Sequence, residues 1–266
     1  MKRIHSHSDE RLELSEFIRR CDEKIVSQRA DISAAAEDLA ALARNKSHLT
    51  SLLANILSER VESAENASSL RYSDQCQILV RRPQYYVRIA AWDVPRQRGD
   101  SFKYDERYFS YGFVHNHNFD LLTAGIYGPG YISVSWRLEI PVQYLSSGRP
   151  VKLVKVPDER LRDGDVLLYE RWHDVHMQQP PESFSMSLNL IVEDFNVPQY
   201  SFDPTQKTAV EHIGGAGHGI AGLFAIARAL NHPDIEVLNE MARRKLGERV
   251  FEELILPQTG SNDAIR

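Results

Sequence analysis

Three histidines are spaced as ligands of one metal ion. His115 and His117 are separated only by Asn116, and His176 follows much later, after a Gly-Asp pair and a short apolar run. Alternate side chains of an extended strand project from the same face, so His115 and His117 point the same way, and a third imidazole would come from a neighbouring strand. Neutral imidazole suits iron, zinc, copper or nickel, and three protein ligands leave positions open for substrate, water or oxygen. The spacing predicts a catalytic metal site.

His173 competes with His176 for the third position. Three positions separate the two, so both cannot lie on one face of a regular strand. His176 is favoured because its Val-His-Met-Gln run continues into the next strand, while His173 is expected in the preceding turn. Three roles stay open for His173: third ligand, catalytic acid or base beside the metal, and surface turn residue.

Other polar side chains are candidates for the substrate site. Tyr127 and Tyr131 flank a glycine-rich turn, and their hydroxyls would serve catalysis and substrate binding, respectively. Arg88 and Arg137 lie in predicted strands, where an inward guanidinium would hold a carboxylate with two hydrogen bonds. Gln178 shares the face of His176 and would bond the substrate or support the ligand. Ser187 and Asn189 share one strand face and are weaker candidates for the same role as Gln178.

Short β-prone runs must position these residues. Between Cys76 and Asp194 glycine, proline, aspartate and serine separate about eight such runs, without helices between them. This pattern is typical of an antiparallel sandwich or jelly-roll barrel. The predicted strands are Cys76–Val80, Gln84–Trp92, Tyr108–His117, Phe119–Ile126, Tyr131–Ile140, Val151–Val156, Asp165–Glu170 and Phe184–Val192.

Helical segments flank the predicted barrel. Apolar residues recur at three- and four-residue spacing from Asp9 to Ser63, with helix-start residues at Asp31–Ser33 and Asn45–Ser47. Helices are also expected at Leu223–Leu230 and Ile235–Leu246. We therefore predict a mainly β fold with flanking helices (α+β): a helical segment at 1–70, a barrel at 71–200 and a helical tail at 201–266. The apolar helix faces would wrap the barrel, cap its mouth or build a homodimer.

Composition excludes several classes of function. The chain has 266 residues and a net charge of −5, without a long basic run, so no nucleic-acid or anionic-membrane partner is expected. Two cysteines, Cys21 and Cys76, are too few for a disulfide scaffold, and no apolar run has membrane-spanning length. We expect a cytoplasmic protein with a small-molecule substrate.

The histidine segments resemble the two motifs of the cupin superfamily. Gly112 precedes His115-Asn116-His117, and Gly164-Asp165 precedes a strand, a tight turn and His176. The resemblance covers Cys76 to Asp194 and implies a jelly-roll barrel in which these three histidines bind the metal. Two departures are informative. Many cupins have a glutamate ligand where this chain has Leu121 and Leu122, and His176 comes one residue late, so the Arg171–Asp174 turn must absorb an extra residue.

The chain is therefore similar to three-histidine cupins, among which thiol dioxygenases are one branch. Asp120 does not replace the missing glutamate, because it faces away from His117 on a regular strand. The resemblance implies a mononuclear non-haem iron(II) oxygenase that uses O2 on a small polar carboxylate, such as an amino acid or a thiol. One alternative is a non-redox lyase or isomerase with zinc, nickel or manganese, which needs a base such as His173 or Glu170. Another is a ligand-sensing cupin module. Copper would also suit the ligands.

One further motif matches a known fingerprint. Gly217–Gly222 has the glycine spacing of a dinucleotide-binding turn. That turn requires a preceding strand within a parallel sheet, whereas helices are expected here, so a lid or a helix cap is the preferred interpretation.

Overall fold

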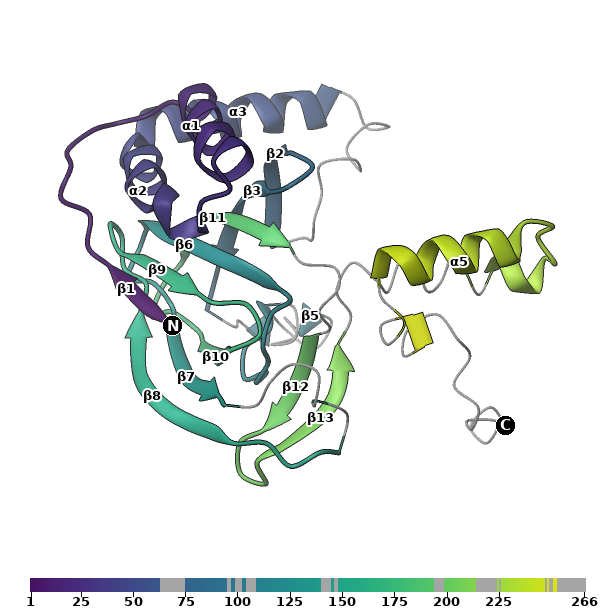
Figure 1. Ribbon diagram of the computed structural model, residues 1–266. Helices are drawn as coiled ribbons and strands as arrows, with labels where there is room; N and C mark the ends of the chain where they lie inside the picture. The colour runs from purple at the N-terminus through teal and green to yellow at the C-terminus, as the bar shows by residue number, and fades with distance from the viewer. Residues whose placement is uncertain are drawn as a thin grey trace.

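A computed structural model describes most of the chain and shows a mainly antiparallel β structure with helices on one side (Figure 1). The described residues are 1–62, 75–94, 97–98, 102–103, 109–139, 145, 148–193, 199–213, 224, 226–246, 248 and 251–252. The predicted fold class is confirmed by this antiparallel arrangement. The glycine-rich stretch Gly217–Gly222 lies outside the described residues.

Two facing sheets form the barrel. The first has the order β1 (Lys2–Ile4), β9 (Val166–Tyr169), β6 (Phe119–Tyr127), β11 (Ser185–Glu193), β3 (Tyr86–Trp92) and β2 (Cys76–Arg81). The second has the order β10 (Asp174–Gln179), β7 (Ile132–Leu138) and β8 (Leu153–Arg160). Two short pairs are β12 (Gln199–Asp203) with β13 (Thr208–Ile213), and β4 (Gln97–Arg98) with β5 (Phe102–Lys103).

Alternation along the six-stranded sheet divides its side chains between two environments. Val87 and Ile89 of β3 pack against the helices, whereas Tyr86 of the same strand lies in a cluster inside the barrel. The same division places Leu122 outside and Leu121 inside. Because neighbouring side chains point to opposite faces, register alone decides which residues can approach a site in the barrel.

The helices cover the outer face of this sheet (Figure 1). They are α1 (Leu14–Cys21), the π-helix η1 (Asp22–Ser27), the 3-10 helix η2 (Ile32–Ala35), α2 (Ala36–Arg44) and α3 (Lys46–Glu62). Both predicted breaks are confirmed. A side-chain oxygen of Asp31 accepts from the Ser33 backbone N–H at 2.8 Å, and Oδ1 of Asn45 accepts from that of His48 at 3.3 Å. These short polar side chains bond the first free N–H groups of each helix.

Three differences from the sequence prediction concern strands. Residues 2–4, placed in a helical segment, form β1 and pair with β9. Residues 208–213, expected to be helical, form β13 and pair with β12. The stretch predicted as the strand Tyr108–His117 is irregular within 109–117 and joins its neighbours through isolated bridges, while residue 108 lies outside the described part. In the first two cases pairing with a distant strand overrides the local pattern.

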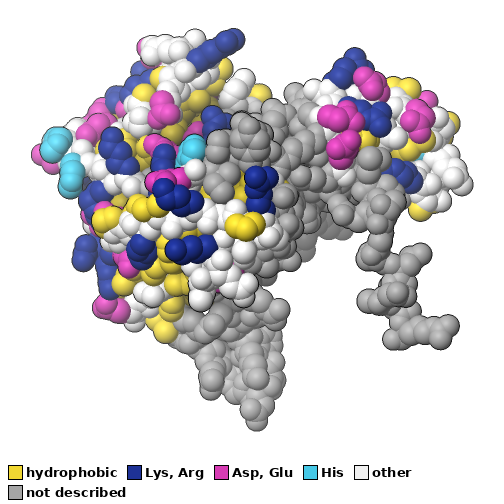
Figure 2. All heavy atoms as spheres, turned by 60° about the horizontal axis from the view of Figure 1, so that its bottom comes forward, with side chains coloured by type: hydrophobic (Ala, Val, Ile, Leu, Met, Phe, Trp, Pro, Cys, Tyr) yellow, Lys and Arg dark blue, Asp and Glu magenta, His cyan; other side chains and the backbone are white. Residues whose placement is uncertain are grey.

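The predicted helix at Ile235–Leu246 is present with those bounds as α5, which projects away from the barrel in Figure 1. Figure 2 shows one face of the molecule, on which basic and acidic side chains are interspersed with apolar ones. Within the described residues, no helix is both long and apolar enough to cross a membrane.

Candidate metal centre

The segment that carries His115 and His117 is held between two strands. The His115 backbone N–H donates to the His176 carbonyl at 3.0 Å, and the His176 N–H donates back at 2.8 Å. On the other side, the Phe202 N–H donates to the Val114 carbonyl at 2.9 Å. Asn116 is fully buried, and its side-chain oxygen accepts from the Tyr200 N–H at 2.7 Å. Asn116 therefore holds the backbone in place, and the side chains of His115 and His117 face the interior of the barrel.

The three imidazoles come together inside the barrel. One ring nitrogen from each of His115, His117 and His176 lies within 4.8 Å of the other two. The Nε2 atoms of His117 and His176 are 2.9 Å apart. Two ligands at about 2.1 Å from one ion and about 90° apart would be separated by roughly 3.0 Å, and tetrahedral ligands by roughly 3.4 Å. The Nε2 atoms of His117 and His176 are therefore already spaced as two ligands of one ion. A pair of ring nitrogens as far apart as 4.8 Å would move closer together when the ion binds.

Burial keeps these imidazoles neutral. It lowers the pKa of His115 to about 4. It also lowers the pKa of His117 and His176 well below the ordinary value, and repulsion from His115 lowers both further. Because the imidazoles bind a second proton only weakly, they are neutral near neutral pH, and each offers a lone pair to a metal ion.

Hydrogen bonds orient two of the three rings. Nδ1 of His115 lies 2.9 Å from the Phe113 carbonyl oxygen, to which it can only donate, and this leaves Nε2 as the lone-pair nitrogen. Nδ1 of His176 lies 3.3 Å from the Gln178 side-chain amide. The remaining Nδ1, that of His117, is buried and has no hydrogen-bond partner among the described residues. The Phe113 contact thus leaves Nε2 of His115 as the metal-binding nitrogen, and Nε2 of His176 would bind in the same way once the Gln178 amide turns its oxygen toward Nδ1.

The turn before β10 absorbs the additional residue of the second motif. Trp172 adopts a left-handed backbone conformation with φ of +70°, and its N–H donates to the His117 carbonyl at 2.7 Å. Asp120 accepts from the Arg171 N–H at 2.8 Å and therefore holds this turn from the opposite face. As expected from its position, Asp120 points away from the imidazoles.

Three predicted site residues lie away from the imidazole cluster. His173 is exposed in the turn, with Nδ1 3.4 Å from the Leu138 carbonyl oxygen. Tyr127 is 59% exposed at the end of β6 and faces Phe184. Arg137 is paired with Glu170 at 2.5 Å and with Asp174 at 3.2 Å. The strand end directs Tyr127 away from the imidazoles, and the ion pairs do so for Arg137, while His173 lies in the turn as its position in the sequence indicated.

Three other predicted residues do face the barrel interior. Arg88 occupies the inward register of β3, opposite Asn189. Burial lowers the pKa of His117 and raises that of Tyr131, and the nearby Arg88 charge has a smaller, lowering effect on each pKa. Tyr131 is buried, with its ring 4.2 Å from that of Trp92. Gln178 is buried and contacts His176, as described above.

The two weaker candidates also lie on this inner face. Asn189 accepts from the Thr123 hydroxyl at 2.6 Å, and Ser187 accepts from the Trp92 indole N–H at 3.0 Å. A polar surface therefore accompanies the imidazoles inside the barrel.

Sequence reasoning missed Tyr169 and Thr123. The Tyr169 ring lies 4.7 Å from that of His176, and its hydroxyl is 2.7 Å from the Ser133 hydroxyl. Burial raises the pKa of Tyr131 to about 12 and that of Tyr169 well above its ordinary value, so both phenols stay protonated. The position of Tyr169 on a strand could have been predicted, because this residue ends the apolar run after Gly164-Asp165. Its orientation depends on pairing with β6, which no local pattern shows.

Comparisons with known proteins give only weak likenesses. No protein-family model matches the sequence, and neither does any curated protein. Similar solved structures include the DMSP lyase DddQ from Ruegeria pomeroyi, with 15% identity over 47% of this chain and 49% of that chain, at a TM-score of 0.28. Another is KdgF from Halomonas sp., with 15% identity over 47% and 85% of the two chains, at a TM-score of 0.27.

A cupin domain from Bordetella pertussis is similar at 10% identity, over 45% of this chain and 92% of that chain, with a TM-score of 0.26. Solved structures similar to the chain thus include cupin proteins. The chain spans about half the length of the two DMSP lyase structures that it matches.

Proposed function

We propose that this protein is a mononuclear iron(II) oxygenase acting on a small, carboxylate-bearing substrate. The observation that carries the proposal is the cluster of His115, His117 and His176, whose ring nitrogens lie within 4.8 Å of one another. Within the described part of the chain, this potential metal-binding group contains imidazoles only. A neutral ligand set of this kind suits iron(II), although zinc, nickel, manganese and copper remain chemically compatible.

The protein's own groups would hold and shield the metal. Bound iron(II) would supply open coordination positions and one-electron chemistry with O2. The Phe113 carbonyl and the Gln178 amide would fix the rings of His115 and His176. The buried ring of Phe119 would limit water around the site, because it stacks on the His117 ring with 4.3 Å between the ring centroids.

Arg88 is the proposed anchor for the substrate. Its side chain lies on the inward face of β3, and its charge interacts with both His117 and Tyr131. A guanidinium binds a carboxylate through two parallel hydrogen bonds, which would orient the substrate beside the metal. The protonated Tyr131 hydroxyl would add a polar contact without acting as a base.

The non-redox alternative has less support. A lyase or isomerase needs a base close to the metal, and the two bases suggested by sequence were His173 and Glu170. Both are exposed, and Glu170 is paired with Arg137. Their positions favour the oxygenase over the alternative.

Oxygen consumption tests the proposal. Protein reconstituted anaerobically with iron(II) or with zinc is exposed to O2 with a panel of amino acids and thiol-bearing carboxylates, and products are identified by mass spectrometry. We expect substrate-dependent O2 uptake by the iron form alone, loss of uptake in His176→Ala, and retention in the exposed-histidine control His173→Ala. Equal turnover by the zinc form without O2 uptake would contradict the oxygenase.

A further inference from the structure

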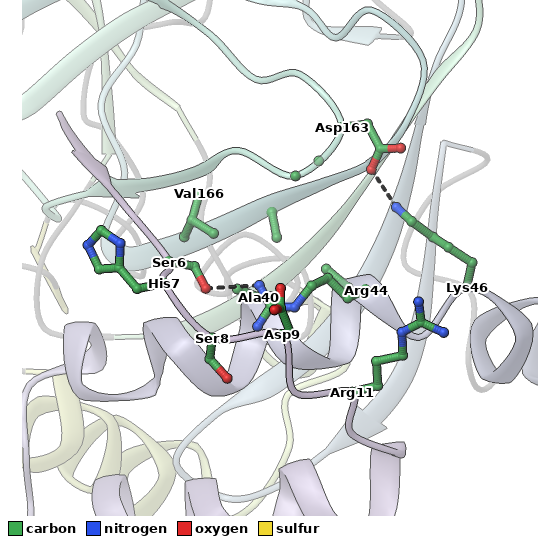
Figure 3. Close-up of a pocket in the computed structure, with 14 residues that line it drawn as sticks. Ser6, His7, Ser8, Asp9, Arg11, Ala40, Arg44, Lys46, Asp163 and Val166 are labelled. Atoms are coloured by element: carbon green, nitrogen blue, oxygen red, sulfur yellow. Dashed lines mark hydrogen bonds and ion pairs between the residues drawn. The ribbon is translucent and has the colours of Figure 1, made fainter.

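We propose that a second site, on the outside of the barrel, binds the phosphate group of a small molecule. The site is a pocket of about 600 Å³ between the segment 6–11, helix α2 and the sheet (Figure 3). Alanine and glycine residues form much of its wall: Ala40, Ala43, Ala124, Gly125 and Gly164. Such short side chains leave room for a ligand larger than a single ion.

Arg44 is one of the basic residues that line this pocket. Its Nε donates to the Glu10 carbonyl at 3.0 Å, and its Nη1 donates to the Ser6 hydroxyl at 2.9 Å. Its Nη2 is buried and has no hydrogen-bond partner among the described residues. Leaving a buried charged donor unsatisfied is costly, so this atom indicates an acceptor that the protein itself does not provide.

Arg11 supplies a second cation on the same wall. Its side chain is exposed and makes no hydrogen bond or ion pair within the described residues. In the view of Figure 3, it lies between the side chains of Arg44 and Lys46. Two guanidinium groups of this kind match the several acceptor oxygens of a phosphate.

The residues that line the pocket include one more basic side chain than carboxylates. Lys46 is bonded to Asp163, and these two charges offset each other. Among the residues that line the pocket, Arg11 and Arg44 then face the carboxylate of Asp9, while Glu10 and Glu37, outside the lining, also interact electrostatically with Arg44. The two guanidinium groups, rather than an overall positive charge, would attract an anionic ligand. This site shares no lining residue with the imidazole cluster.

Calorimetric titration of the full chain with inorganic phosphate tests the proposal. The variants are Arg11→Gln, Arg44→Gln and the control Arg29→Gln, which removes an equal charge from an exposed arginine that does not line the pocket. We expect saturable phosphate binding, weaker binding of acetate, and at least about tenfold weaker phosphate binding in Arg11→Gln and Arg44→Gln. Arg29→Gln should bind like the unmodified chain.

Because Arg11 makes no contact that the fold requires, its variant remains informative even if Arg44→Gln fails to fold. Absence of saturable phosphate binding would overturn the proposal, as would equal weakening in Arg11→Gln and Arg29→Gln. Metal content should stay unchanged in Arg11→Gln, so failure here is distinguishable from failure of the proposed oxygenase.

Discussion

Replacing Gln178 with leucine should weaken metal binding while leaving the fold intact. Gln178 is 6% exposed, and its amide lies 3.3 Å from Nδ1 of His176. When Nε2 of His176 binds a metal, Nδ1 carries the proton and needs an acceptor. Turning the Gln178 amide by 180° would present Oε1, which is buried and lacks a hydrogen-bond partner among the described residues. Leucine has a similar size but accepts nothing.

The expected loss follows from that single contact. Removing the outer partner of a ligating histidine costs about 10- to 100-fold in metal affinity. A contact of 3.3 Å is at the long end for a hydrogen bond, so we expect a loss near tenfold, or about 1.4 kcal/mol. Gln178→Glu should retain or increase affinity, because a carboxylate is a stronger acceptor for the His176 N–H.

Competition with a chromophoric chelator measures these affinities. Gln179→Leu is the matched control, since Gln179 is the exposed neighbour on the opposite face of β10. Equal affinity in Gln178→Leu and Gln179→Leu, with both proteins folded, would refute the assignment of Nε2 as the ligand atom of His176.

The remaining predictions concern stability and are measured by urea unfolding. Gly125→Ala should cost roughly 1–3 kcal/mol or more, because a Cβ there would lie 1.9 Å from the Arg162 carbonyl oxygen. Gly112→Ala should cost less, roughly 1–2 kcal/mol from its φ of +71°, because nothing lies within 4 Å of its Cβ; the reverse order would contradict the packing argument. Leu42→Ala should lower the free energy of unfolding by about 2–5 kcal/mol, because this α2 side chain is fully buried against the outer face of the sheet. A loss below about 1 kcal/mol would show that the helices are not packed on the barrel. Asp174→Ala should cost roughly 1–3 kcal/mol, because this buried carboxylate accepts a backbone N–H of the turn before His176, and an unchanged midpoint would exclude that role.

The sequence predicted the features that depend on local pattern. The spacing of His115 and His117 indicated a common face, and the Gly164-Asp165 turn located the strand that leads to His176. Helix-start residues at Asp31 and Asn45 marked the breaks between helices. In these cases a short stretch of chain contains the physical cause of the structure.

Features that depend on distant pairing were not predictable in this way. Residues 2–4 form a strand only because β9 offers a free edge, and residues 208–213 form one through pairing with β12. The inward position of Arg88 and the diversion of Arg137 into ion pairs were indistinguishable by sequence, since both arginines occupy strands. Register and acidic neighbours, brought together by the fold, decide between them.

Metal stoichiometry tests the central claim most directly. Elemental analysis would compare the protein reconstituted with iron(II) with its variants His115→Ala, His117→Ala and His176→Ala, and with the control His173→Ala. We expect one metal per chain in the unmodified protein and in the control, and loss of that metal in each of the three variants. Full metal content in all three variants would contradict the account.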